Sequence, residues 1–288
     1  MVGKQNVSKG KYLNFSHKQE IDMFVSKYNI GIEYNGSAFH SSLNNVYTDK
    51  PKLYHQAKFL QAKKQGIHII SLFDVDWLYN QDKVKEYFTS LLISNKRVYA
   101  RKCSLEKIDK KTAHDFCNNY HLQGQARIDS ICYGLYYDEE LVEVMTFGKM
   151  RLKKQQEGHY ELHRLCTKSG ITVVGGASKL LKAFEKEYYP LNLLSYSNND
   201  YFTGNIYPTL GFDYIKQVAP PYYWFYNNIE YKREKCQVKK LRVLHPELVK
   251  EAEAKEVGIE DYVMIKLGAR KVYRSGNTRW EKHYENNN

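Results

Sequence analysis

In the first third of the chain, the order of apolar and polar positions predicts an α/β unit. Short runs rich in Ile, Val, Phe and Tyr at 21–25 and 30–34 predict two strands joined as a hairpin. The longer apolar run at 67–73 is typical of a buried central strand. Helices are predicted at 54–65, which ends before a glycine, and at 83–93, where apolar residues recur at helical spacing. The expected order is therefore strand, strand, helix, strand, helix.

A second pattern begins near residue 96, where short strands alternate with two helices. One helix is predicted at 112–120, and Gly175 and Gly176 open another helix with an apolar stripe. The expected strands lie at 98–102, 130–137, 141–147, 160–166, 191–196, 213–218 and 222–226. The strands at 130–137 and 141–147 are expected to form a hairpin.

The last part of the chain differs in composition from the rest. From about residue 228 it is rich in Lys and Arg, and Pro246 begins a helix of mixed charge. We therefore predict the α/β (α+β) fold class. The three expected parts are an α/β core at 1–95, a mixed-sheet domain at 96–227 and a basic extension at 228–288.

Composition favours a folded protein with a polyanionic partner. Hydrophobic residues make up 42% of the 288 positions, which is enough for two packed cores. The 44 Lys and Arg against 32 Asp and Glu give a formal charge of +12, and the rings of 26 Tyr can stack on bases. Five widely spaced Cys without a CxxC pair indicate neither a zinc knuckle nor a disulfide framework, so we expect reduced thiols in the cytoplasm. No apolar run reaches the roughly 18 residues of a membrane span, and the polar start lacks a signal-peptide core.

Two carboxylates on the first hairpin form the candidate catalytic centre. The hairpin can bring Asp22 and Glu33 side by side, and a hard divalent cation such as Mg²⁺ or Mn²⁺ prefers oxygen ligands. A metal-bound water could then act as a nucleophile. The alternative is that both are exposed strand residues, although Asp is disfavoured in strands. Asp74 and Asp76, which follow the apolar run, are interpreted as turn or cap residues.

This part of the sequence resembles a family of nucleases. The spacing of Asp22, Glu33 and Asn35 resembles the D-x(n)-E-x-K core of the PD-(D/E)XK nucleases, with Asn35 where the lysine usually stands. The pieces GIEYNGSAFHSS, YH and KKQGIHIISLFDVDWL resemble the first domain of phage-encoded homing endonucleases related to very-short-patch repair endonucleases. The resemblance covers residues 20–93. It implies that Asn35, or Lys58 from the following helix, substitutes for the missing lysine.

The same resemblance implies roles for the acidic residues and for two histidines. Asp22 would be a metal ligand, and Glu33 a second ligand or a base. His40, in the G-x-x-x-H piece, and His55 would assist the chemistry. The alternative for each histidine is a hydrogen-bonded structural residue.

Residues 99–226 resemble a different superfamily, the GNAT acyltransferases. The resemblance is carried by a strand before VVGGASKLLKAF, a splayed strand after it, and the YPTLGF piece. It implies that the turn of Gly175, Gly176 and Ala177 binds the pyrophosphate of acyl-coenzyme A, and that Tyr207 can serve as a general acid.

This sequence departs from the GNAT pattern at two positions. Thr172 replaces the usual Arg or Gln at the start of the loop, and Pro208 stands where the family prefers a helix former. A strand-to-helix turn is the alternative for the two glycines.

The last twenty-odd residues interleave basic and aromatic side chains. Basic residues of this kind bind phosphates, and Arg or aromatic side chains can reach bases. The alternative is a solvated tail. The candidate nucleic-acid contacts are Arg270, Lys271, Arg274, Arg279 and Trp280.

Together these patterns lead to one main hypothesis and two others. The main hypothesis is a site-specific, metal-dependent homing endonuclease that hydrolyses phosphodiester bonds in double-stranded DNA, in the cytoplasm of a bacterial host. A GNAT-like acyltransferase or DNA-modifying enzyme is the second, and a DNA-binding protein with a decayed nuclease site is the third. The sequence does not decide the target site, whether one strand or both are cut, or whether the protein is a monomer or a homodimer.

Overall fold

Four sheets organise the part of the chain that the computed structural model describes, which is residues 7–13, 19–37, 52–150, 156–227 and 229–285. The N-terminal sheet has the order β1-β2-β3-β4, in which β3 and β4 are parallel and the other pairs antiparallel. Its strands are β1 (Val7–Leu13), β2 (Gln19–Val25), β3 (Ile30–Asn35) and β4 (His68–Phe73), with the 3₁₀ turn η2 (Ser26–Tyr28) between β2 and β3. The predicted hairpin is present as β2 and β3, whereas the run predicted as a buried central strand forms β4 at the edge of this sheet.

Two helices cover the opposite faces of this sheet. Phe59 of α1 (Tyr54–Lys64) packs with Ile69 on one face, whereas α2 (Asp74–Leu92) packs against Ile70 on the other. Successive strand residues point to opposite faces, so neighbouring apolar positions serve two cores. Helix α2 begins nine residues before the predicted helix, because Asp74 and Asp76 lie in its first turn, where carboxylates are favourable.

The largest sheet has seven strands in the order β12-β16-β11-β9-β8-β7-β6. The predicted hairpin is present as β7 and β8. Helices α3 (Lys110–Tyr120) and α4 (Gly176–Tyr188) pack on opposite faces of this sheet. The strands are β6 (Ser104–Lys107), β7 (Asp129–Tyr137), β8 (Glu140–Gly148), β9 (His159–Thr167), β11 (Asn192–Asn198), β12 (Asp213–Val218) and β16 (Asn277–His283), and the short helix α5 (Ile206–Thr209) precedes β12.

The main core lies between this sheet and α4. Phe184 of α4 stacks on Phe147 of β8 with ring centroids 3.8 Å apart, and Leu180 and Leu181 are buried beside it. These are the apolar stripe residues of the predicted helix. A two-stranded parallel sheet, formed by β5 (Lys96–Tyr99) and β10 (Ile171–Val174), borders this core. The 3₁₀ turn η3 (Ala100–Lys102) follows β5.

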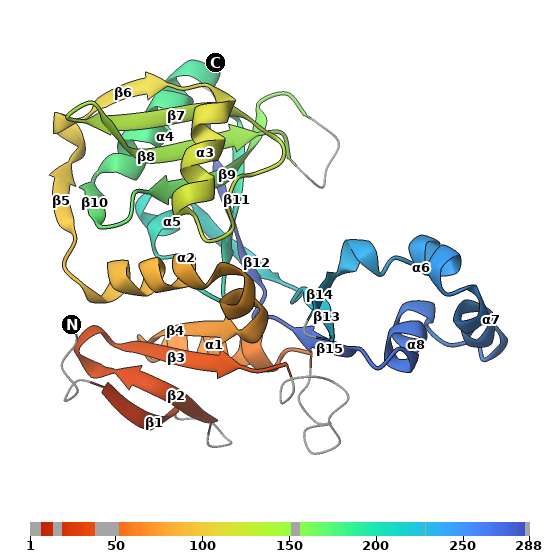
Figure 1. Cartoon of the computed structure of the whole chain (residues 1–288). Coiled ribbons are helices and arrows are strands. Elements are labelled where there is room, and N and C mark those ends of the chain that lie inside the picture. Colours follow the sequence, from red (N-terminus) through yellow and green to blue (C-terminus); the bar gives the residue numbers. More distant parts are fainter. Residues whose placement is uncertain (1–6, 14–18, 38–51, 151–155, 228, 286–288) are drawn as a thin grey trace.

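A helical insertion, residues 229–269, separates β12 from β16 in sequence. It projects from the side of the molecule, as Figure 1 shows. Its core contains Leu241 and Val263, which pack with Trp224 from the strand before the insertion. The insertion and its base comprise β13 (Tyr222–Tyr226), β14 (Ile229–Lys232), η4 (Arg233–Lys235), α6 (Val238–Leu244), α7 (Pro246–Ala254), α8 (Ile259–Lys266) and β15 (Arg270–Tyr273).

After the insertion, the chain re-enters the large sheet as an interior strand, β16. Strand β16 pairs with β11 on one side and β12 on the other, and its Trp280 is only 3% exposed. The region predicted as a basic extension therefore supplies a central strand, which carries a buried aromatic side chain and hydrogen bonds on both edges.

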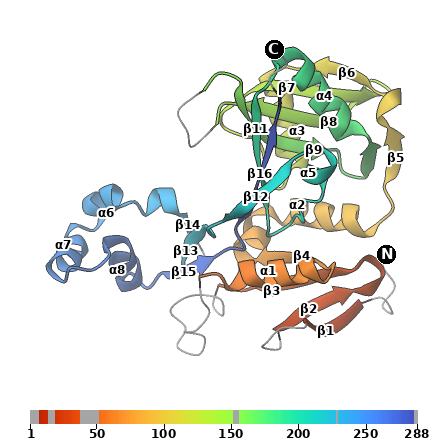
Figure 2. The same ribbon diagram turned by 180° about the vertical axis from the view of Figure 1, so that it is seen from behind.

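The N-terminal sheet and the large sheet contact each other through α2 and β4 (Figures 1 and 2). Ser71 N donates to Asp200 O at 2.7 Å, Tyr87 Oη donates to Tyr201 O at 2.5 Å, and Lys63 Nζ donates to Thr203 O at 2.7 Å. Within the described ranges, no helix combines the length and apolar character that a transmembrane span requires.

Candidate active site

The large sheet opens between its two central parallel strands. Strands β9 and β11 pair from His159 and Asn192 to Leu162 and Ser195, and their pairing then ends. The register of β9 against β8 shifts at the same level, so His163 has no partner residue on β8. Beyond this bulge β9 stays with β8 and β11 stays with β16, which separates the two strands.

A cleft of about 780 Å³ begins at this separation. Its walls come from β9 and β11, from α2, from the turn after α3 and from α5, so both halves of the chain contribute. No aspartate or glutamate is among its lining residues in the described part of the chain. The side chains used below are His68, Tyr87, His121, Gln123, His163, Arg164, Asn198, Phe202 and Tyr207.

Tyr207 lies at the level where the strands separate. Its hydroxyl is 2.9 Å from Ser195 Oγ and 3.3 Å from Tyr196 O, and its ring stacks on Trp280 with centroids 5.2 Å apart. Ser195 Oγ also donates to Leu162 O at 3.0 Å, across the last paired position. Burial raises the pKa of Tyr207, so the phenol keeps its proton at neutral pH.

Two histidines of the cleft are neutral, and each has a hydrogen bond to the backbone. Gln123 N donates to His121 Nδ1 at 3.1 Å, which leaves the proton of the neutral ring on Nε2. Burial, with the charges of Arg164 and Lys83, lowers the pKa of His121 to about 3. His68 Nε2 lies 2.7 Å from Tyr201 O and therefore donates to it, and burial lowers its pKa.

A third histidine, His163, stands at the bulge itself. Its side chain is fully buried, and neither ring nitrogen has a hydrogen-bond partner among the described residues. Nδ1 is 3.4 Å from Glu161 Oε1. Next to it, Arg164 donates to Gly124 O at 2.7 Å and to Gln125 O at 3.2 Å, which holds the turn after α3 against β9.

The predicted glycine turn joins β10 to α4. Gly175 is exposed with φ +80°, a conformation that favours glycine. Gly176 is buried, and a Cβ there would overlap the Glu143 carboxylate. Glu143 Oε1 accepts from Thr167 Oγ1 at 2.9 Å, Oε2 has no partner in the described part of the chain, and burial raises the pKa of Glu143 to about 7. Neither these glycines nor Ala177 line the cleft.

The predicted carboxylates of the first hairpin do come together, with Lys58. Lys58 Nζ lies 2.5 Å from Glu33 Oε2, and both side chains are about 5% exposed. Asp22 N donates to Glu33 Oε1 at 3.2 Å, and Asp22 Oδ2 accepts from Tyr34 N at 2.8 Å. Both Glu33 oxygens and Asp22 Oδ2 therefore already bind protein donors. Burial raises the pKa of Glu33, and Lys58 opposes this shift.

The other predicted residues of this half lie apart from that group or outside the description. His55 is buried against Tyr54 and Phe73, with ring centroids 5.1 and 5.2 Å away. Asn35 is 1% exposed, and its amide atoms have no partner among the described residues. His40 falls outside the described residues.

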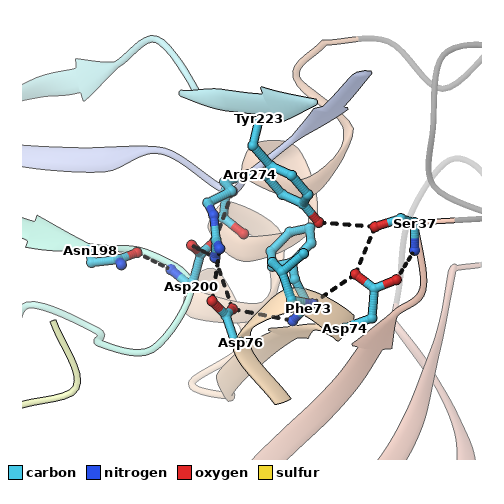
Figure 3. Close-up of polar contacts among 10 residues, drawn as sticks. Ser37, Phe73, Asp74, Asp76, Asn198, Asp200, Tyr223 and Arg274 are labelled. Carbon is cyan, nitrogen blue, oxygen red and sulfur yellow. Dashed lines mark hydrogen bonds and ion pairs between the residues drawn. The ribbon is translucent and has the colours of Figure 1, made fainter. Parts of the chain in front are cut away.

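The candidate nucleic-acid contacts are mostly engaged within the protein. Lys271 Nζ pairs with Asp261 at 2.7 Å, Arg279 pairs with Glu281, and Trp280 Nε1 donates to Ser197 Oγ at 2.9 Å. Arg274 binds Asp76 and Asp200, as Figure 3 shows. Of the five, only Arg270 is exposed.

Asp200 and His163 are the residues that the sequence interpretation missed. Asp200 accepts from Arg274 and from Ser275 N at 2.9 Å although it is 1% exposed. The one local sequence feature that marks Asp200 is the polar NND segment at the end of an apolar strand. His163 sits in the predicted strand at 160–166, where no periodicity marks a bulge.

The chain was compared with family models, curated proteins and solved structures. No family model and no curated protein matches this sequence. Among solved structures, the chain is similar to a GNAT family acetyltransferase from Elizabethkingia anophelis with acetyl-CoA bound, at 11% identity and a TM-score of 0.36, over 64% of this chain and 99% of that one. It is also similar to a Bacillus subtilis acetyltransferase in complex with CoA, at 14% identity and a TM-score of 0.34, over 64% and 100%. A third is the IAA acetyltransferase from Bacillus cereus, at 12% identity and a TM-score of 0.33, over 63% and 99%.

These findings overturn the identification as a homing endonuclease. The similar structures are acetyltransferases, two of them with acetyl-CoA or CoA, so the predicted deoxyribonuclease activity and double-stranded DNA partner are wrong. The predicted Mg²⁺ or Mn²⁺ is wrong as well: in the described ranges, no group of three or more His, Cys, Asp or Glu could hold a metal ion. The Lys58 ammonium occupies the place beside Glu33 where a cation was expected.

Proposed function

We propose that this protein is a GNAT-like acyltransferase that moves an acyl group from a coenzyme A thioester to an amine. The observation that carries the proposal is the cleft of about 780 Å³ where β9 and β11 separate. A cleft of this size is within the usual range for small-molecule sites, roughly 300–1,000 Å³. The three sequence landmarks of the GNAT resemblance also lie around it, as β9, β11 and the Tyr207 turn.

Two different parts of the protein would bind the thioester arm and the diphosphate of acyl-coenzyme A. Where β9 and β11 separate, neutral side chains such as Ser195 and Tyr207 line the cleft, which suits the thioester arm. The backbone N–H groups of Gly175, Gly176 and Ala177 at the start of α4 would hold its diphosphate. Glu143 lies against this turn, and with a pKa of about 7 it is uncharged in roughly half of the molecules near neutral pH. An uncharged Glu143 does not repel a diphosphate.

Acyl transfer needs two proton transfers, and a different side chain would carry out each of them. The bound thioester supplies a carbonyl carbon that an amine can attack, with formation of a C–N bond and loss of the C–S bond. His163 Nε2 would take the proton that the amine loses, while Glu161 Oε1 lies 3.4 Å from Nδ1 of the same ring. Tyr207 would give its phenolic proton to the departing sulfur and regain one from solvent.

The lining of the cleft also favours a class of acceptor. Amide and aromatic side chains such as Gln123, Asn198 and Phe202 line it, with Arg164, and no carboxylate does so among the described residues. A strongly cationic amine would find no acidic side chain to pair with among these lining residues. A weakly basic amine on a planar or polar body is therefore the proposed acceptor.

Two measurements test the proposal in sequence. Calorimetric titration of the full chain with acetyl-CoA tests donor binding without knowledge of the acceptor. Thiol release from acetyl-CoA is then followed with aromatic amines, nucleosides and polyamines as acceptors. We expect binding, faster release with weakly basic amines, and slower release after Tyr207→Phe. The matched control is Tyr214→Phe, which removes the hydroxyl of a tyrosine that is 55% exposed. Absence of acetyl-CoA binding, or equal rates for both variants, would contradict the proposal.

A further inference from the structure

The helical insertion contains a second pocket, remote from the cleft. Its volume is about 340 Å³, and it lies between the β13–β14 hairpin, α6 and α8. It shares no lining residue with the cleft. The walls are Tyr226, Tyr231, Lys235, Cys236, Lys240, Leu241, Leu244, His245, Met264, Leu267 and Ala269.

The inside of this pocket is apolar and largely aliphatic. Leu241, Met264 and Ala269 are buried, and Leu267 packs against the same core. Cys236, at 1% exposure, has a pKa that burial raises to about 11, so its thiol stays uncharged. A flexible hydrocarbon chain would replace water against these walls with a gain that grows with each methylene.

The edge of the pocket carries positive charge that is not held in an ion pair within the described part of the chain. Lys235 and Lys240 are exposed pocket residues, and neither has an ion pair among the described residues. Residues 232–242 hold six Lys or Arg and one Glu. The neighbouring carboxylates serve other groups: Glu260 accepts from Tyr222 and Trp224, Asp261 pairs with Lys271, and Glu253 pairs with Arg242.

We propose that this pocket binds a medium-chain fatty carboxylate. The chain would lie against Leu241, Met264 and Leu267, and the carboxylate would lie between Lys235 and Lys240. The apolar wall excludes a charged body, and the two ammonium groups match a single anionic head. The site is independent of the acyl transfer proposed above, because it uses none of the residues of the cleft.

Calorimetric titration of the full chain with sodium decanoate tests the site. We expect one binding site, and affinity that rises about fourfold per methylene from octanoate to decanoate. Decan-1-ol should bind at least tenfold more weakly than decanoate, because it lacks the charge that the two lysines compensate. Equal binding of the alcohol would overturn the proposal.

Two sets of variants locate the binding. Lys235→Ala with Lys240→Ala should weaken decanoate binding at least tenfold. The matched control, Lys232→Ala with Lys239→Ala, removes two exposed lysines of the same segment that do not line the pocket, and it should change binding less than twofold. Equal losses in both pairs would indicate nonspecific attraction and overturn the proposal.

A cavity-filling change gives a readout that does not depend on charge. Leu244 lines the pocket and is 64% exposed, so Leu244→Trp can place an indole in the cavity without disturbing the buried core. We expect it to abolish decanoate binding while the far-UV spectrum and thermal midpoint stay within the range of the control pair. Unchanged binding in this variant would place decanoate elsewhere and overturn the proposal.

Discussion

Arg274 and Asp76 form a two-point ion pair between segments 198 residues apart in sequence. Nη1 lies 2.9 Å from Oδ2 and Nη2 lies 2.8 Å from Oδ1. The same guanidinium reaches Asp200 Oδ2 at 3.2 Å and lies 4.8 Å from the Phe73 ring centroid (Figure 3). The Arg274 side chain thereby links helix α2, the segment that follows β11 and the segment that precedes β16. This junction holds one wall of the cleft, because Tyr87 of α2 lines it.

Removing this junction should loosen the N-terminal sheet from the large sheet. Arg274→Ala leaves Asp76 and the 1%-exposed Asp200 without their cation, and breaking a buried pair in this way typically costs 3–5 kcal/mol. We expect a loss of about 3 kcal/mol in the free energy of unfolding, measured by urea titration. An additional early transition should appear in the fluorescence of Trp77, which lies on α2.

The control for that change is an exposed ion pair of the same type. Arg242 pairs with Glu253 at 2.8 Å, but its side chain is 59% exposed. Arg242→Ala should therefore alter stability by less than about 1 kcal/mol. Similar effects for Arg274→Ala and Arg242→Ala would show that the junction does not hold the two sheets together.

The Glu33–Lys58 pair should be strongly coupled in stability. Glu33→Gln or Lys58→Met alone leaves a buried charge without its partner and should cost about 3 kcal/mol. The double variant should cost clearly less than the sum of the two, because neither charge then remains. Urea unfolding of the parent protein, the two single variants and the double variant gives the coupling energy directly. Additive losses of stability would contradict the expected coupling. Lys107→Ala, in a pair about half exposed, is the control.

Glu143 should make the protein less stable as pH rises. Its pKa is about 7 in the folded protein and near 4.5 in the unfolded chain. Between these values the unfolded state loses the proton first and the folded state retains it, so the free energy of unfolding falls from pH 4.5 to pH 7. The full shift corresponds to a loss on the order of 3 kcal/mol.

Glu143→Gln tests this pH dependence, since the amide resembles the uncharged acid. Thermal unfolding between pH 4.5 and pH 8 should show a flatter profile for the variant and a higher midpoint at pH 8 than for the parent protein. Glu106→Gln, which removes an exposed carboxyl group on β6, should leave the profile unchanged. A parent profile that rises over this range, with no effect of Glu143→Gln, would disprove the assignment.

His163→Gln tests the proposed proton acceptor of acyl transfer. General-base groups contribute roughly 10²–10⁴-fold, so kcat should fall at least a hundredfold while the Kd for acetyl-CoA changes little. The control is His283→Gln, whose side chain is 63% exposed on β16. Loss of acetyl-CoA binding in His163→Gln would indicate a structural role instead.

The sequence by itself determined the local elements of this protein. Alternation gave β7 and β8 close to their observed bounds, and helical spacing gave the start and the apolar stripe of α4. The predicted first hairpin does bring Asp22 near Glu33. The nuclease hypothesis was wrong because this local arrangement of acids does not reveal that Lys58 is buried against Glu33.

Only the tertiary structure decided how distant segments meet. The insertion of β16 beside β11, the pairing of Arg274 with Asp76 and the bulge at His163 join positions that no local period connects. Basic and aromatic residues near the end of the chain have the composition of an exposed tail, yet Trp280 packs on Tyr207 and Arg274 is neutralised by two aspartates. Burial of a charged or aromatic side chain depends on which partner the fold brings to it, and that information is absent from the residue's own neighbourhood in sequence.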